Sequence, residues 1–229
     1  MVALFVLLTF VLIISINLIV TKVREKRISV FEETQPETVA KTVFTKESIY
    51  VPQGLYYSKG HTWLNFAEDG KLKLGIDDFI NKVLKPGKIF SLKAEGDKVS
   101  RGEPIFEILV NGRKVKIYSP VDGVIVSLNN SIFENLNLLR ENPYRDNWLI
   151  EIEPADVKVV LPSLKIGKEV VNWMKDEVDR FKDLLAHLSP KPSLVGATLY
   201  DGGNIVEGVV RLLDEDGISK FEKEFLKLS

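Results

Sequence analysis

The sequence predicts a mainly β protein with an N-terminal transmembrane helix and a small C-terminal α+β module. Three observations predict it. Residues 2–20 carry no charge, short runs of alternating apolar residues recur between 71 and 153, and residues 166–188 repeat apolar side chains every three or four positions. We therefore expect four parts: an anchor at 1–22, a tether at 23–53, a β domain at 54–160, and a helix-hairpin-helix module at 161–229.

The anchor prediction depends on length and on the flanking charges. A helix over residues 2–20 would span roughly 28 Å, close to the hydrocarbon thickness of a bilayer. A signal peptide is the alternative, but it needs basic residues before the apolar run and a small-residue cleavage site after it. Here the basic residues follow the run, at Lys22, Arg24, Lys26 and Arg27. We expect a single-pass membrane protein whose globular part lies in the cytoplasm.

Composition excludes several function classes. The chain has 229 residues, 31 Lys and Arg against 32 Asp and Glu, no cysteine and two histidines, His61 and His187. A net charge of −1 gives no field that would attract nucleic acid. Without cysteine there is no disulfide, thiolate metal site or thiol nucleophile. We expect no catalytic residues, no metal site and no enzymatic activity.

The tether and the β domain differ in pattern. Residues 23–53 mix charge, Thr and Pro36 without a sustained period, which is typical of a linker. Beyond them, turn signals separate short strand-like runs, and Asn111-Gly112 is typical of a type I′ hairpin. We expect strands at 71–76, 88–94, 104–110, 113–120, 123–128 and 147–153.

Several of these segments together resemble the glycine cleavage system H-protein family. The resemblance covers about residues 55–156 and rests on GLYYSKGHTWLNF, GEPIFEI, IYSPVDG and ENPYRDNWL, in that order. It implies a barrel-sandwich hybrid of the lipoyl and biotinyl type, with short helices around 77–84 and 135–140. It also implies a lysine at a hairpin tip that is lipoylated and visits several enzymes in turn.

The chain departs from the family where that chemistry takes place. Ungapped counts from both sides place Gly112 at the lipoyl-lysine position and Leu109 where the family motif has a glutamate. Lys114, two residues on, is the fallback attachment site. Thr62 stands where many relatives have a glutamate between His and Trp. We therefore expect a domain that keeps the fold and has no cofactor.

The other conspicuous residues are expected to be structural. We interpret His61 and Trp63 as a packed core pair, and Arg113, Lys114 and Lys116 as a solvated basic face. Gly202-Gly203 is interpreted as a hairpin turn, because no following helix with a lysine fits a phosphate loop.

The C-terminal module combines an amphipathic helix at 166–188, a hairpin around 201–203 and a final helix at 218–228. On the first helix we expect the apolar face to be formed by Val170, Val171, Trp173, Met174, Val178, Phe181, Leu184, Leu185 and Leu188.

Three functional hypotheses follow. The favoured one is a non-catalytic, membrane-anchored scaffold or accessory subunit with protein partners in a membrane-associated complex. The second is a membrane-tethered lipoyl carrier modified at Lys114. The third is a periplasmic adaptor of the membrane-fusion type, but such adaptors insert a long helical hairpin where this chain has only the residues NGRK.

Overall fold

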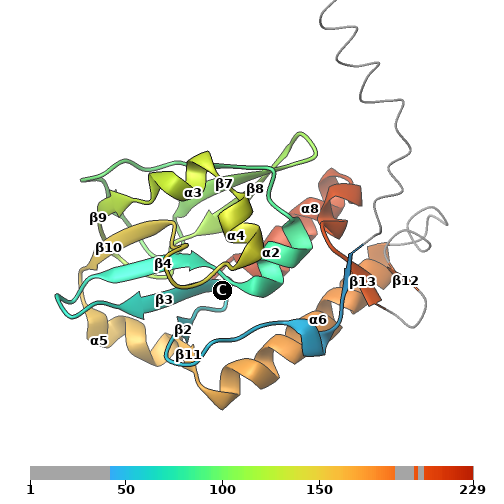
Figure 1. The fold of residues 1–229 in the computed structure, drawn as a ribbon, viewed down its shortest axis with the longest axis horizontal. Coiled ribbons are helices and arrows are strands. Elements are labelled where there is room, and N and C mark those ends of the chain that lie inside the picture. The colour runs from blue at the N-terminus through green and yellow to red at the C-terminus, as the bar shows by residue number, and fades with distance from the viewer. Residues whose placement is uncertain (1–41, 189–198, 201–203, 229) are drawn as a thin grey trace, which may run out of the picture. The chain divides into compact units, whose positions relative to one another are not determined.

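Three antiparallel sheets organise the described part of the chain (Figure 1). This computed structural model describes residues 42–188, 199–200 and 204–228. The large sheet has the strand order β11-β2-β3-β4-β10-β9-β6, the second β5-β7-β8, and the third β1-β13-β12. The strands are β1 Val43–Phe44, β2 Tyr56–Tyr57, β3 Thr62–Phe66, β4 Leu72–Ile76, β5 Lys88–Ser91, β6 Lys98–Val99, β7 Pro104–Val110, β8 Arg113–Tyr118, β9 Gly123–Leu128, β10 Ile150–Pro154, β11 Lys165–Ile166, β12 Leu199–Tyr200 and β13 Asn204–Val206.

Helices cover these sheets and connect them. They are the 3-10 turns η1 Lys46–Ser48, η2 Leu161–Ser163 and η3 Val209–Leu212, the helices α2 Asp78–Leu84, α3 Asn130–Glu134, α4 Asn137–Glu141, α5 Val157–Val160, α6 Lys168–Leu188 and α8 Glu215–Phe221, and the π-helical turn η4 Glu222–Leu226. The mainly β character predicted for residues 54–160 is confirmed, as are the strands predicted at 104–110 and 123–128.

Helix α2 begins and ends at residues suited to those positions. The Asp77 side chain caps it by accepting a hydrogen bond from the Ile80 N–H at 2.9 Å, and Lys85 ends it in the left-handed region. Between these two capping residues the helix has four buried apolar side chains: Phe79, Ile80, Val83 and Leu84. Asp77, the residue that starts this helix, also reaches the buried histidine described below.

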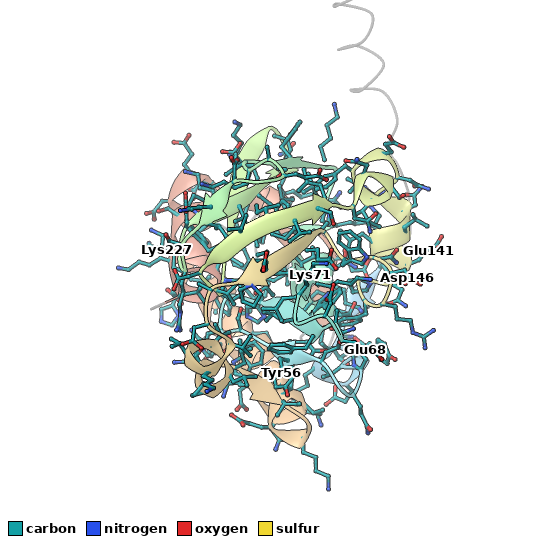
Figure 2. All side chains as sticks on the ribbon, turned by 90° about the vertical axis from the view of Figure 1, so that its left-hand side faces the viewer. Tyr56, Glu68, Lys71, Glu141, Asp146 and Lys227 are labelled. Carbon is teal, nitrogen blue, oxygen red and sulfur yellow. The ribbon has the colours of Figure 1, made fainter. Side chains whose placement is uncertain are left out.

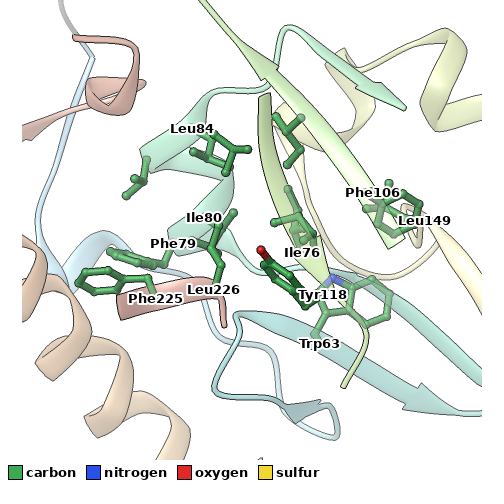
Figure 3. Close-up of a cluster of buried hydrophobic side chains, with 14 of the residues drawn as sticks. Trp63, Ile76, Phe79, Ile80, Leu84, Phe106, Tyr118, Leu149, Phe225 and Leu226 are labelled. Atoms are coloured by element: carbon green, nitrogen blue, oxygen red, sulfur yellow. The ribbon is translucent and has the colours of Figure 1, made fainter. Parts of the chain in front are cut away.

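Trp63 is a buried and hydrogen-bonded residue of the large sheet. Its indole is 1% exposed and donates a hydrogen bond to the Pro143 carbonyl at 2.8 Å. Its cross-strand partner is Gly75, where a Cβ would come within 2.7 Å of the indole. The prediction that His61 and Trp63 are buried core residues is confirmed, and Figure 3 shows Trp63 and Ile76 within the apolar cluster.

Residues 42–53 differ from the tether that the sequence predicts. Val43 and Phe44 pair with Val206 and Ile205 to form β1, and Phe44 is buried. The Tyr50 N–H donates to Asp78 Oδ2 at 2.8 Å, and its carbonyl accepts from the Tyr144 hydroxyl at 2.8 Å. This segment gains its structure from partners far along the chain, which a local pattern does not reveal.

The C-terminal module is less separate than the sequence predicts. Residues from Thr42 onward form one compact unit, and Phe181 of α6 lies edge-on to Phe79 of α2 as well as to Phe221. The predicted final helix at 218–228 is α8 followed by the turn η4. Val171, expected on the apolar face of α6, is 40% exposed. Figure 3 shows Phe225 beside Phe79, so the last helical turn lies against α2.

The surface of the described unit is charged and mixed in sign. Figure 2 shows Glu141 and Lys227 at opposite edges of the molecule. Within the described ranges, no helix combines the length and the apolar composition that a membrane crossing requires. The predicted anchor at 2–20 lies outside those ranges, as do the first residues of the predicted tether, 23–41.

Candidate functional site

The β7–β8 hairpin presents the position at which the family resemblance implies chemistry. Asn111 and Gly112 both have positive φ, at 49° and 76°, as a type I′ turn requires. The predicted turn is therefore confirmed. Its two-residue connection between Val110 and Arg113 leaves no helical insertion of the membrane-fusion type.

The hairpin apex does not fit a lipoyl group. Gly112 is exposed, and a Cβ there would meet no atom within 4 Å, but the residue has no amine to acylate. Leu109, half-buried on β7, stands directly opposite Lys114 on β8. No other residue of the turn supplies an amine at the apex.

The basic residues beside the apex are engaged within the chain. The Arg113 guanidinium donates to the Leu213 carbonyl. Lys114 Nζ lies 2.7 Å from Glu107 Oε2, although 63% of the Lys114 side chain is exposed. The Lys116 backbone N–H donates to Glu222 Oε1 at 2.7 Å. Of these three contacts, the Lys114–Glu107 pair is the one that compensates a side-chain charge.

The C-terminal segment holds the hairpin from one side. Besides the Arg113 bond, the Asn111 side-chain amide donates to the Arg211 carbonyl at 3.2 Å. The same segment is tied to α2, because the Gly208 N–H donates to the Lys82 carbonyl at 2.7 Å. Figure 1 shows α8 close to β8 and to the end of α2. The flank of the hairpin is therefore covered while its apex stays exposed.

His61 is the second unusual group, and it is fully buried. It ends the turn before β3 with φ at 59°, and its Nδ1 forms a 2.7 Å hydrogen bond with Asp77 Oδ2. On the other side of the ring, Nε2 lies 3.5 Å from Glu177 Oε2 of α6, an ion pair rather than a short hydrogen bond. The imidazole thus lies between two carboxylates from different parts of the chain.

Aromatic rings and one arginine surround His61 and its two carboxylate partners. The Trp173 ring stacks on the His61 ring with centroids 4.9 Å apart. The Phe79 ring is tilted against the His61 ring, and their centroids are 4.8 Å apart. The Trp173 indole N–H donates to Glu177 Oε1 at 2.9 Å, and Arg180 binds both oxygens of the same carboxylate. We call His61, Asp77, Glu177, Trp173 and Arg180 the His61 junction, because it joins α6 to the sheet and α2.

The charges at the junction follow from burial and from these partners. Burial would lower the pKa of His61, but the charges and hydrogen bonds of Asp77 and Glu177 outweigh it and raise the pKa to about 9. Burial would raise the pKa of Glu177, yet His61 and Arg180 lower it. Burial raises the pKa of Asp77 despite the imidazolium beside it. At neutral pH His61 is therefore a buried cation that holds two elements together.

Glu177 was not among the residues predicted from the sequence. Helical spacing offered a signal, because Glu177 follows Trp173 by four residues and precedes Phe181 by four, on the apolar face of α6. A carboxylate within such a face indicates a buried partner.

The expected turn at Gly202-Gly203 lies outside the described residues.

A close approach of two backbone segments occurs at Gly60. A Cβ there would stand 2.7 Å from the Leu226 carbonyl oxygen and 3.2 Å from a Leu228 methyl group. Gly60 therefore lets the C-terminal turn η4 pack directly against the segment that carries His61.

Comparison with known proteins identifies the family. The family model of the glycine cleavage H-protein matches residues 55–177, more than half of the chain. A probable glycine cleavage system H protein of Thermococcus gammatolerans is 32% identical over 55% of this chain and 92% of its own length. The glycine cleavage system H protein of Oceanobacillus iheyensis is 34% identical over 47% of this chain and 85% of its own length.

A solved structure also aligns with about half of the chain. The glycine cleavage system H protein of Mycobacterium marinum aligns with a TM-score of 0.46 and 24% identity, covering 54% of this chain and 98% of that one. The residues matched by the family model include the strands and short helices between Tyr56 and Pro154. This chain therefore belongs to the glycine cleavage H-protein family.

Proposed function

We propose that this protein is a non-catalytic, membrane-anchored member of the H-protein family that serves as a scaffold or accessory subunit of a membrane-associated complex. The observation that carries the proposal is Gly112 at the apex of the β7–β8 hairpin. An acyl carrier needs a primary amine at the position its ligase reads, and a glycine in a type I′ turn supplies none.

The contacts around the hairpin support the same conclusion. Bonds from Asn111 and Arg113 tie the hairpin to backbone carbonyls of the C-terminal segment. A carrier hairpin has to enter the sites of several enzymes, whereas this one already has a partner on its flank. The surface next to the apex is thus used for holding the fold together, which suits a docking subunit better than a carrier.

Intact-mass measurement tests the absence of a prosthetic group. The full chain is expressed in a lipoylation-competent host with lipoate supplied, and we expect only the unmodified mass. The matched control is the double variant Leu109→Glu with Gly112→Lys, which restores both family residues. Its lysine must accept a positive φ at a cost of about 1 kcal/mol, so the hairpin should survive. A stoichiometric lipoyl adduct on the unaltered chain would overturn the proposal.

A carrier modified at Lys114 is the second candidate. Its support is the exposed amine of Lys114, two residues from the apex, with a single carboxylate partner, Glu107, among the described residues. Peptide mapping distinguishes it from the favoured function. An adduct that disappears in Lys114→Arg would promote the carrier, since arginine keeps the charge but cannot be acylated in the same way.

Membrane attachment through residues 2–20 is part of the proposal. Its support is the uncharged run followed by Lys22, Arg24, Lys26 and Arg27, which also favours a cytoplasmic location for the folded part. Alkaline carbonate should leave the protein in the membrane pellet. A C-terminal reporter that fluoresces only in the cytoplasm should be bright, and one active only after export should be silent. The opposite pattern would make the periplasmic adaptor the leading function.

The partners are expected to be proteins rather than nucleic acid. The net charge of −1 gives no support for binding a polyanion. Mild solubilisation of membranes followed by affinity purification of the intact chain should recover a stable set of co-purifying proteins. Recovery of the chain alone at every salt concentration would contradict an accessory-subunit role.

A further inference from the structure

A cavity of about 320 Å³ lies beside the turn that ends at His61, and none of its lining residues belongs to the hairpin apex or to the His61 junction. It is formed where the turn before β3, the turn after β6 and the segment before α6 meet. Its volume is at the lower end of ligand pockets, so it suits a small molecule or a single functional group. Its lining includes Lys59, Arg101, Pro120, Pro162, Lys165 and Glu169.

The charges around this cavity are predominantly positive. Three cations line it, Lys59, Arg101 and Lys165, against the single carboxylate of Glu169. Lys165 Nζ lies 2.6 Å from Glu169 Oε1, so these two charges compensate each other. In the part of the chain that the structure describes, no carboxylate lies within ion-pair distance of Lys59 or of the Arg101 guanidinium.

The remaining groups do not cancel this positive charge. Asp122 accepts a hydrogen bond from the Arg101 backbone N–H at 2.8 Å, which fixes the turn and leaves the side chain available. Ser163 donates its hydroxyl proton to the Val160 carbonyl at 2.7 Å. Pro120 and Pro162 stiffen two sides of the cavity. Recognition here would therefore come from Lys59 and Arg101.

We infer that this cavity binds a phosphate group, either as inorganic phosphate or as the head of a small phosphate ester. Two uncompensated cations match the charge of about −2 that a phosphate monoester carries at neutral pH. Guanidinium can bind two phosphate oxygens at once, while the lysine ammonium contributes a point charge. A carboxylate carries half that charge and would leave one cation unmatched.

Calorimetric titration of the full chain in nonionic micelles tests the inference, with inorganic phosphate and glycerol 3-phosphate as probes. The chain should bind both with one site, and acetate should bind at least about tenfold more weakly. Lys59→Met and Arg101→Met should each weaken phosphate binding, and the double variant should lose at least about tenfold in affinity. Lys98→Met, which removes one exposed charge from β6, is the matched control and should stay within about twofold.

The binding affinities and the thermal unfolding of the variants together distinguish the possible outcomes. Equal affinity of the double variant and the Lys98→Met control would overturn the inference, as would binding that cannot be saturated. Unchanged thermal unfolding of Lys59→Met establishes that a loss of binding is not a loss of fold. Dihexanoyl phosphatidic acid, used below its micellar concentration, then identifies the source: tighter binding than glycerol 3-phosphate assigns a lipid headgroup, and equal binding assigns a soluble phosphate.

Discussion

The hairpin apex and the His61 junction are both places where the C-terminal segment meets the H-protein-like part of the chain, but they do so by opposite means. At the apex, the side chains of Asn111 and Arg113 reach backbone carbonyls, and a Cβ on Gly112 would meet no atom within 4 Å. At the junction, a fully buried cation lies between two carboxylates and is covered by rings. We therefore expect the attachment of the C-terminal segment to depend mainly on the junction, and the apex to contribute little to stability.

The largest expected effect comes from the apolar packing beside the junction. Phe181 is fully buried and packs against Phe79, Phe221 and Phe225, so Phe181→Ala should destabilise the fold by about 3–5 kcal/mol. The partly exposed neighbour Lys182 is the matched control, and Lys182→Ala should stay within about 0.5 kcal/mol. Urea unfolding measures both. Equal small effects would mean that α6 does not dock as described.

The buried cation should make stability depend on pH. The pKa of His61 is about 9 in the folded chain and about 6.5 in the unfolded one. Its stabilising contribution is therefore fully present below pH about 6.5 and is lost as the pH rises through about 9, an effect of a few kcal/mol. The free energy of unfolding should therefore fall as the pH is raised from 6 to 9.5.

The variant His61→Asn serves as the reference for that series. Asparagine tolerates the positive φ of this position and does not titrate in the range. Its stability should be lower at pH 6 and should change less with pH. Parallel curves for the two proteins would show that folding does not raise the pKa of His61.

A smaller effect is expected where η4 meets the segment before β3. Gly60→Ala places a methyl group 2.7 Å from the Leu226 carbonyl, so the C-terminal turn must shift, at a cost of about 1–3 kcal/mol. Gly87→Ala is the control, because its Cβ would meet only the Leu109 carbonyl at 3.6 Å, an ordinary contact. Thermal unfolding should separate the two variants, and identical values would argue against the close approach of η4.

The smallest effects should come from the hairpin. Arg113→Met removes the bond to the Leu213 carbonyl and should cost about 1 kcal/mol. Lys114→Met removes an exposed ion pair and should change stability by less than about 0.5 kcal/mol. If either loss approached that of Phe181→Ala, the contrast between the apex and the junction would be wrong.

Local patterns in the sequence predicted much of this architecture. Alternating side chains and the Asn111-Gly112 turn predicted β7, its hairpin partner and the position of the apex, because these depend on neighbours in the chain. The strand β1 was missed because Val43 and Phe44 find their partners in β13. The His61 junction was missed for the same reason, since His61, Asp77 and Glu177 come from three separate elements.

The bond between Glu222 and the Lys116 N–H has a consequence for self-association. β8 is the outer strand of the β5-β7-β8 sheet, and an unpaired outer strand is a template for pairing with another molecule. Glu222 occupies one of its free donors with a negatively charged side chain. Removal of residues from α8 onward would therefore expose a bare strand edge, and the chain should become prone to aggregation through it.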